Sequence, residues 1–165
     1  MTSSTELEIS TPTDREVVLK RTFDAPRELV FEALTTPELL KRWYGPTGWT
    51  LILCEIDLKV GGNWHFVVQR PDGKKIGQKG VYHEVISPER IVNTESWEDW
   101  NPGETLVTTT LVEVERKTTL TSTSLFPSKE VRDIILKSGL ADGAKQSYER
   151  LADLLRSVRE RGNVG

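Results

Sequence analysis

The sequence predicts an α+β domain in which a curved antiparallel sheet of about seven strands wraps around one long C-terminal helix. Apolar and polar residues alternate with a period of two through most of the region 50–126, and a helical period of about 3.6 residues begins at Ser128. Turn residues separate the alternating segments by short connections, so consecutive strands should pair as an antiparallel meander. Such a sheet needs a helix across its concave face, and only the C-terminal helix is long enough.

The N-terminal part predicts one strand followed by two short helices. Residues 1–14 are polar and rich in Ser and Thr, and we expect them to form a disordered lead. Glu16–Phe23 alternates and is rich in β-branched residues, which favours a strand. Asp24-Ala25-Pro26 is a typical helix start, and the apolar face that follows ends near Thr36. Pro37 then opens a second, shorter helix.

Six further strands and the long helix complete the predicted domain. The helical stripe continues from Ser128 to Val158, and we expect Gly139 and Gly143 to bend or interrupt it. Residues 159–165 are expected to form a flexible tail. A helix of roughly 17 residues spans about 25 Å, which is comparable to the width of the sheet. The predicted strands are Thr50–Leu58, Asn63–Gln69, Gly77–Ile86, Arg90–Trp97, Thr105–Val112 and Thr118–Phe126.

Composition excludes several classes of function. The formal net charge of −3 argues against nucleic-acid binding, which needs a concentrated basic face. No apolar run reaches the roughly 18 to 20 residues that a membrane-spanning helix needs, and the N-terminus lacks the apolar core of a signal peptide. Cys54 is the only cysteine, which suits a reducing compartment. No nucleotide-binding, zinc or cofactor motif is present. We therefore expect one cytoplasmic domain over residues 15–158, without a cofactor or a metal.

The segment 41–49 is the most informative stretch of the chain. Its three large aromatic residues stand beside Gly45-Pro46 and Gly48. This composition is typical of neither a solvated loop nor a regular helix, because glycine and proline permit and impose unusual backbone angles. The aromatic side chains must be buried by the rest of the fold or form the rim of a cavity.

Several strings of residues resemble one known family. Together they resemble the AHSA-type branch, named after the activator of heat-shock-protein-90 ATPase, of the START-like (SRPBCC) helix-grip superfamily, over about Arg15 to Leu155. The resemblance implies a helix-grip fold with a cavity more firmly than it implies a reaction. The strings are Phe23-Asp24-Ala25-Pro26 with Val30-Phe31 and Ala33-Leu34-Thr35; Trp43-Tyr44-Gly45-Pro46; Gly61-Gly62-Asn63-Trp64-His65-Phe66; and Gly80-Val81-Tyr82-His83-Glu84-Val85 followed by Pro88-Glu89-Arg90-Ile91.

The first functional hypothesis is a binding protein for a small, largely apolar or amphipathic molecule held between the sheet and the C-terminal helix. Hydroxyls from the Thr- and Ser-rich strands 105–124 would make the cavity amphipathic if they face it, although β-propensity on a solvent face explains them too. Core packing is likewise an alternative explanation for the aromatic residues. The predicted ligand-binding residues are Trp43, Trp64, Phe66, Tyr82, Glu84, Trp97 and Tyr148.

The sequence allows two interpretations of the carboxylate of Glu84. If Tyr82, Glu84 and Ile86 face the concave side, Glu84 lies in an apolar cavity with a raised pKa and can orient a ligand hydroxyl. It would then also be the acid or base of a cyclase- or hydratase-like enzyme, which is the third functional hypothesis. Alternatively, Glu84 pairs with Arg90 across the following turn.

The second hypothesis is a co-chaperone-type interaction module acting on a heat-shock-protein-90 homologue, as the family name and its link to the stress response imply. It would use an exposed sheet face or the Trp97–Trp100 loop. Eukaryotic co-chaperones of the family carry an additional N-terminal domain, and we expect none in the short lead of this chain.

Three further residues are expected to have structural roles. His65 alternates with Trp64 and Phe66, so it should face outward when they face inward, and His83 is likewise expected on a surface or in a cross-strand pair. Cys54 lies among aliphatic residues and is expected to be a buried, inert thiol.

Overall fold

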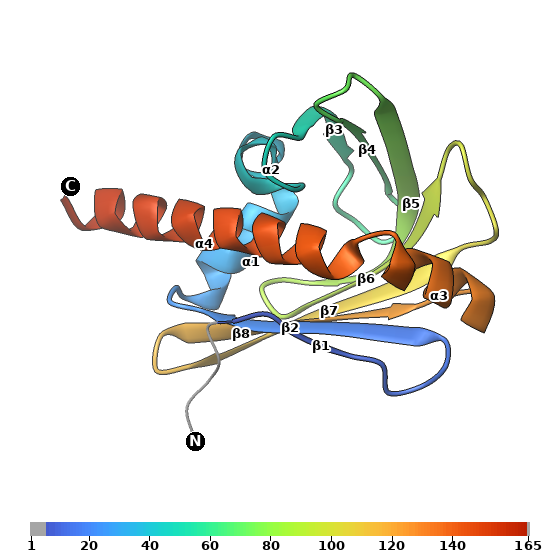
Figure 1. Ribbon diagram of the computed structural model, residues 1–165. Coiled ribbons are helices and arrows are strands. Elements are labelled where there is room, and N and C mark those ends of the chain that lie inside the picture. The colour runs from blue at the N-terminus through green and yellow to red at the C-terminus, as the bar shows by residue number, and fades with distance from the viewer. Residues whose placement is uncertain (1–5, 165) are drawn as a thin grey trace.

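The computed structural model describes residues 6–164, with side chains as far as Arg159, and confirms the predicted α+β helix-grip fold. Eight strands form one antiparallel sheet in the order β1-β2-β8-β7-β6-β5-β4-β3, and α4 runs across its concave side (Figure 1). The strands are β1 (Glu8–Ser10), β2 (Glu16–Phe23), β3 (Thr50–Ile56), β4 (Asn63–Gln69), β5 (Lys75–Ile86), β6 (Arg90–Trp97), β7 (Thr105–Val114) and β8 (Lys117–Leu125). The helices are α1 (Arg27–Thr35), α2 (Pro37–Trp43), α3 (Lys129–Lys137) and α4 (Leu140–Val164).

The structure differs from the prediction at both ends. The eighth strand, β1, lies within the predicted disordered lead and pairs with the edge of β2 from Glu8↔Lys20 to Ser10↔Val18. At the other end, α4 continues to Val164, past the predicted helix end at Val158. None of the helices within residues 6–164 is both long and apolar enough to cross a membrane.

The predicted interruption of the C-terminal helix is found at Gly139. This residue has φ 92°, a left-handed conformation that glycine adopts without a steric penalty, and it separates α3 from α4. Gly143, the second predicted break, lies inside α4.

The core fills the space between the concave face of the sheet and α4. Register partners in an antiparallel sheet share a face, so Leu111 of β7 and its partner Leu120 of β8 point together toward the helix. From α4, Leu151 is fully buried against the same cluster. The long helix is thus held by burial of its apolar stripe, and every strand from β2 to β8 contributes to the surface beneath it.

Candidate functional site between the sheet and α4

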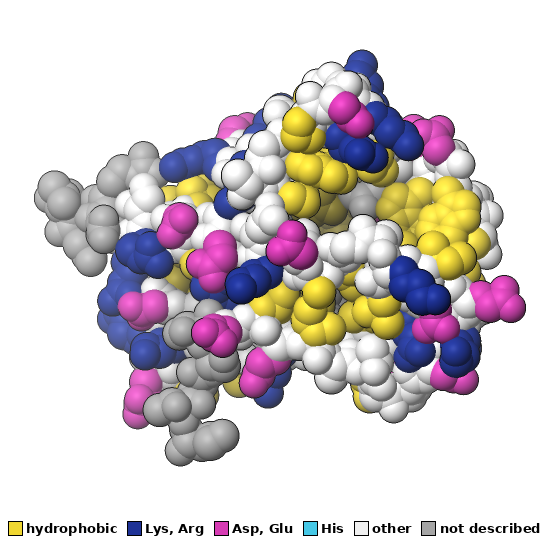
Figure 2. All heavy atoms as spheres, in the orientation of Figure 1, with side chains coloured by type: hydrophobic (Ala, Val, Ile, Leu, Met, Phe, Trp, Pro, Cys, Tyr) yellow, Lys and Arg dark blue, Asp and Glu magenta, His cyan; other side chains and the backbone are white. Residues whose placement is uncertain are grey.

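The space-filling view shows a hollow in the surface between α4 and the strands β3 and β4, with hydrophobic side chains around its opening (Figure 2). The concave face of the sheet and the aromatic turn 44–49 define this region of the fold.

An arginine of α4 fixes the aromatic turn. Gly45 has φ 97° and Gly48 has φ 89°, so the chain reverses sharply after α2. The Nη1 of Arg150 donates hydrogen bonds to the carbonyl oxygens of Gly45 at 2.9 Å and Pro46 at 3.3 Å. This guanidinium satisfies carbonyls that a helix end leaves free, and it ties the turn that contains Tyr44 to α4.

Tyr44 is the centre of a cluster of aromatic rings that we call the aromatic floor, formed by Trp43, Tyr44, Trp64, Phe66 and Tyr148. Its ring makes edge contacts with Trp43 at 5.7 Å and Phe66 at 5.2 Å between ring centroids, and Phe66 in turn contacts Trp64 at 5.0 Å. Tyr148 of α4 lies 6.4 Å from Trp43. Edge-to-face packing of this kind stabilises a rigid apolar surface.

The structure places most of the predicted aromatic wall residues in the main core. Trp43, Trp64, Phe66 and Tyr82 are buried there, and Tyr148 packs against them. Both indole N–H groups are already used: Trp43 donates to the Ala33 carbonyl at 2.9 Å and Trp64 to the Thr94 carbonyl at 3.1 Å. The two indoles therefore have no free N–H to donate to a ligand, and their rings are only 4% and 5% exposed.

Trp97 lies toward another part of the concave face. It packs against the second core cluster, which contains Phe126 and Val131, and its ring lies 5.5 Å from that of Trp100. Trp100 is 37% exposed. The Trp97–Trp100 pair thus joins the interior of the fold to its surface.

Glu95 is a carboxylate on the concave face. Along β6, Ile91 packs in the main core and Trp97 in the second cluster, so the alternate residues Asn93 and Glu95 share that inward face. Glu95 keeps some exposed surface but is enclosed closely enough that burial raises its pKa to about 7. Its charge also contributes to raising the pKa of Tyr44, which places the two groups near one another.

The groups around Glu95 are polar but incompletely paired. Its register partner on β7 is Thr105, which is 1% exposed and whose Oγ1 has no hydrogen-bond partner among the described residues. The Tyr44 hydroxyl donates to Gln78 Oε1 at 2.9 Å rather than to Glu95. Within residues 6–159, no side chain forms an ion pair or a hydrogen bond with Glu95.

Glu84 adopts the alternative arrangement, the pair with Arg90. The Arg90 Nε lies 3.1 Å from Glu84 Oε1, and both side chains are about two-fifths exposed. A β-bulge between Tyr82 and Glu84 explains the change of face, because the extra residue shifts the alternation. Val85 packs against the core, so its neighbour Glu84 points to the convex side. Sequence reasoning missed Glu95, although the alternation Ile91–Asn93–Glu95–Trp97 carries the signal.

His65 and His83 lie on the surface side of the sheet, as predicted. His65 contacts Glu98 and lies 3.7 Å from Glu55, in a cross-strand cluster on the outer face. His83 is exposed. Across the described part of the chain, no group of His, Cys, Asp or Glu side chains could hold a metal ion. Cys54 is half-buried against the core rather than fully buried, and burial raises the pKa of its thiol to about 11, which disfavours the thiolate.

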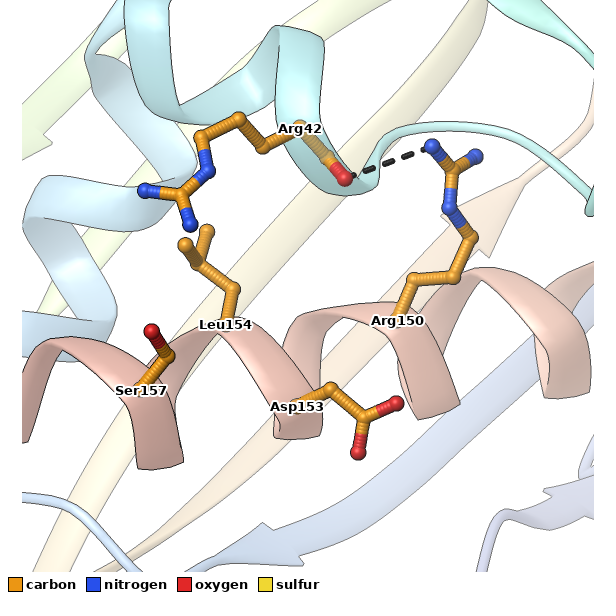
Figure 3. Close-up of a pocket in the computed structure, with 5 residues that line it drawn as sticks. All are labelled: Arg42, Arg150, Asp153, Leu154 and Ser157. Carbon is orange, nitrogen blue, oxygen red and sulfur yellow. Dashed lines mark hydrogen bonds between the residues drawn. The ribbon is translucent and has the colours of Figure 1, made fainter.

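A second depression, of about 280 Å³, lies on the outer side of α4 against α2 (Figure 3). Arg150 borders it, but its guanidinium is already committed to the carbonyls of the aromatic turn and of Arg42. Asp153 pairs with Arg156 at 2.9 Å. This groove is open and bordered by charged side chains, and its lining explains the attachment of α2 to α4. Its lining residues are Arg42, Arg150, Asp153, Leu154 and Ser157.

A sheet that grips a long helix and leaves a hollow beside it defines the helix-grip class of proteins. Residues 24–156 match the family described as "Activator of Hsp90 ATPase homolog 1-like protein", and the chain belongs to that family. Family and fold together support a ligand-binding or co-chaperone-like module.

Solved structures of bacterial proteins share the whole fold. A protein from Rhodobacter sphaeroides is 30% identical, with a TM-score of 0.87 over 92% of this chain and 99% of that one. A protein from Nitrosomonas europaea is 27% identical, with a TM-score of 0.82 over 91% of this chain and 99% of its own. The AHSA1 protein from Silicibacter pomeroyi, 20% identical with a TM-score of 0.70 over 86% and 97% of the two chains, shows the fold alone. No curated protein matches the chain.

Proposed function

We propose that the protein binds a small, largely apolar or amphipathic molecule in the hollow between the sheet and α4. One observation carries the proposal: polar side chains that keep exposed surface lie on the concave face, beside an aromatic floor. Thr109 and its register partner Ser122 share the inward face with Ile91, yet both keep exposed surface beneath the helices. A completely packed core would cover such groups or exclude them.

The amphipathic character of this face suits a ligand with an apolar body and few polar groups. The half-buried rings of Tyr44, Trp97 and Tyr148 offer apolar contact surface, and hydroxyls and a carboxylate stand where they can orient a bound molecule. Both parts come from regular elements, namely strands β4 to β8, and from the turn that Arg150 holds. The hollow is therefore preorganised, which favours binding because little side-chain ordering remains.

A matched pair of blocking variants tests this proposal. Thr109→Phe adds a large ring to the concave face, whereas Thr110→Phe adds the same ring to the convex face one residue away. We expect N-phenyl-1-naphthylamine, a neutral apolar fluorophore, to bind the wild type and Thr110→Phe but not Thr109→Phe. Equal fluorescence enhancement in both variants, or none in the wild type, would contradict the proposal. Native mass spectrometry of the purified protein would identify a ligand that co-purifies.

The co-chaperone alternative rests on the family and on the exposed Trp100. A purified heat-shock-protein-90 homologue should then show faster ATP hydrolysis with this protein, and Trp100→Ala should remove the effect while leaving fluorophore binding intact. The enzyme alternative loses its base, since Glu84 lies on the convex side in an ion pair with Arg90.

A further inference from the structure

Three polar groups on the concave face have binding capacity that the protein leaves unused. Glu95 accepts no hydrogen bond within residues 6–159, and Thr105 Oγ1 is buried beside it without a partner. Gln78 uses its carbonyl oxygen to accept the Tyr44 hydroxyl, and no described residue accepts from its amide N–H groups. Of these three groups only Thr105 Oγ1 is fully buried, while Glu95 and Gln78 are half-buried. Buried polar groups are normally paired, so this set offers a ligand groups that it can complete.

We propose that the hollow takes a cationic amine with an aromatic or alkyl body, its ammonium against Glu95 and Thr105 and its body on the aromatic floor. This inference rests on the proposed function and specifies the class of ligand.

Glu95 and Thr105, the proposed anchor, have the hydrogen-bond acceptors that an ammonium group needs. Glu95 offers two carboxylate oxygens and Thr105 a hydroxyl oxygen, all of which accept hydrogen bonds, and an ammonium has only donors. The two residues are register partners, so their Cβ atoms lie about 5 Å apart on one face. The carboxylate and the hydroxyl are therefore neighbours on this face. Hydrogen bonds between charged partners are about twice as strong as neutral ones.

Charge around the anchor selects against other ligands. Arg21 is the buried cation of the concave face, but it lies on β2, separated from β6 by two strands, and pairs with Glu149 at 3.1 Å. No cation of the described residues neutralises Glu95. An anionic ligand would place like charges together in a site of low polarity, whereas a cation would remove the unfavourable burial of an isolated carboxylate.

The aromatic residues add a second reason for a cation. Trp97 is two residues from Glu95 on the same face of β6, and Tyr44 is close enough for the Glu95 charge to act on it. Aromatic faces attract ammonium groups most strongly when water is excluded. The raised pKa of Glu95 agrees with a carboxylate that lacks its counter-ion.

Three probes with one ring system and three charges test the ligand class. 1-Naphthylmethylamine is protonated near neutral pH, 1-naphthylmethanol is neutral and 1-naphthoate is an anion. We expect the amine to bind about 10- to 100-fold more tightly than the alcohol, and the anion more weakly than either, by isothermal titration calorimetry at pH 8. Equal affinity for amine and alcohol would overturn the cationic class and leave the binding hollow intact. Failure of all three probes and of N-phenyl-1-naphthylamine would overturn both proposals.

Single substitutions test which residues bind the ammonium group. E95Q keeps the shape of the side chain and should reduce amine affinity about 10- to 100-fold while leaving alcohol affinity within about twofold. T105V should weaken the amine several-fold. E84Q removes a carboxylate from the convex face and should bind the amine as the wild type does. Unchanged amine affinity in E95Q, or an equal loss in E84Q, would overturn the assignment. Thermal unfolding of each variant confirms that it is folded.

Discussion

The indole of Trp64 lies over Gly80, its register partner across strands β4 and β5, and donates its N–H to the Thr94 carbonyl at 3.1 Å. A Cβ at position 80 would come within 2.6 Å of the indole nitrogen and 1.8 Å of the Thr94 carbonyl oxygen. Because position 80 has no side chain, the Trp64 ring of β4 can lie over β5 and reach the Thr94 carbonyl of β6.

We therefore expect Gly80→Ala to destabilise the protein by about 1 to 3 kcal/mol, because the added methyl group must push backbone or indole aside. Gly143→Ala is the matched control: its Cβ would lie 3.4 Å from Pro46 Cγ, and alanine favours the helix interior. Urea unfolding should show a lower midpoint for the first variant and an unchanged or higher midpoint for the second. A neutral Gly80→Ala would contradict the close approach.

Two buried threonines should respond oppositely to the same substitution. Thr118 is 0% exposed and its hydroxyl donates to the Ala25 carbonyl at 2.7 Å, whereas the Thr105 hydroxyl has no partner within the part of the chain that the structure describes. Thr118→Val leaves a buried carbonyl unpaired and should lower the free energy of unfolding by about 1 to 3 kcal/mol.

Thr105→Val removes only an unpaired hydroxyl and should leave the stability of the ligand-free protein unchanged or raised. Chemical denaturation of both variants makes the comparison. A loss at Thr105 as large as that at Thr118 would mean that the Thr105 hydroxyl has a partner in the free protein, and the proposed amine anchor would lose one of its groups.

The contribution of Arg150 to stability should depend on the shape of its guanidinium as well as on its charge. Its guanidinium reaches several carbonyls of the aromatic turn at once, which the single ammonium of lysine cannot do. We expect Arg150→Lys to lower stability by about 1 to 2 kcal/mol and to loosen the environment of Tyr44, measured by thermal unfolding and near-ultraviolet circular dichroism. Arg156→Lys, which alters only an exposed pair with Asp153, should have little effect. Equal effects of both changes would contradict the capping role.

The fold was predictable because its signals are local. Alternation, turn residues and the return to a helical period each occur within a few neighbouring residues, and they placed His65 outward and Trp64 inward correctly. Strand β1 was not predicted, because its three residues are all exposed and it joins the sheet through its pairing with β2. No apolar alternation marks such a strand.

The polar part of the site was predicted less well, for a specific reason. The bulge in β5 reverses the faces beyond Tyr82, and nothing in the side-chain pattern marks it, so alternation alone could not decide between the two interpretations of Glu84, which lies outside. Glu95 is on a regular strand and follows simple alternation from Ile91. The aromatic rings were easier, because large apolar side chains have few places other than the interior.

The stability of the protein should fall as pH rises through the titration of Glu95. Burial raises the pKa of this carboxyl from 4.5 to about 7, so the folded state holds a proton that the unfolded chain releases earlier. The stabilisation is complete below pH about 4.5 and is lost progressively up to pH about 7, by at most about 3 kcal/mol. E95Q, which stays neutral, should show a flatter profile than the wild type between those values, and a saturating cationic amine should stabilise the wild type most at the upper end. Unfolding free energies measured from pH 4.5 to 8 for both proteins provide the test, and parallel profiles would show that Glu95 does not titrate in this range.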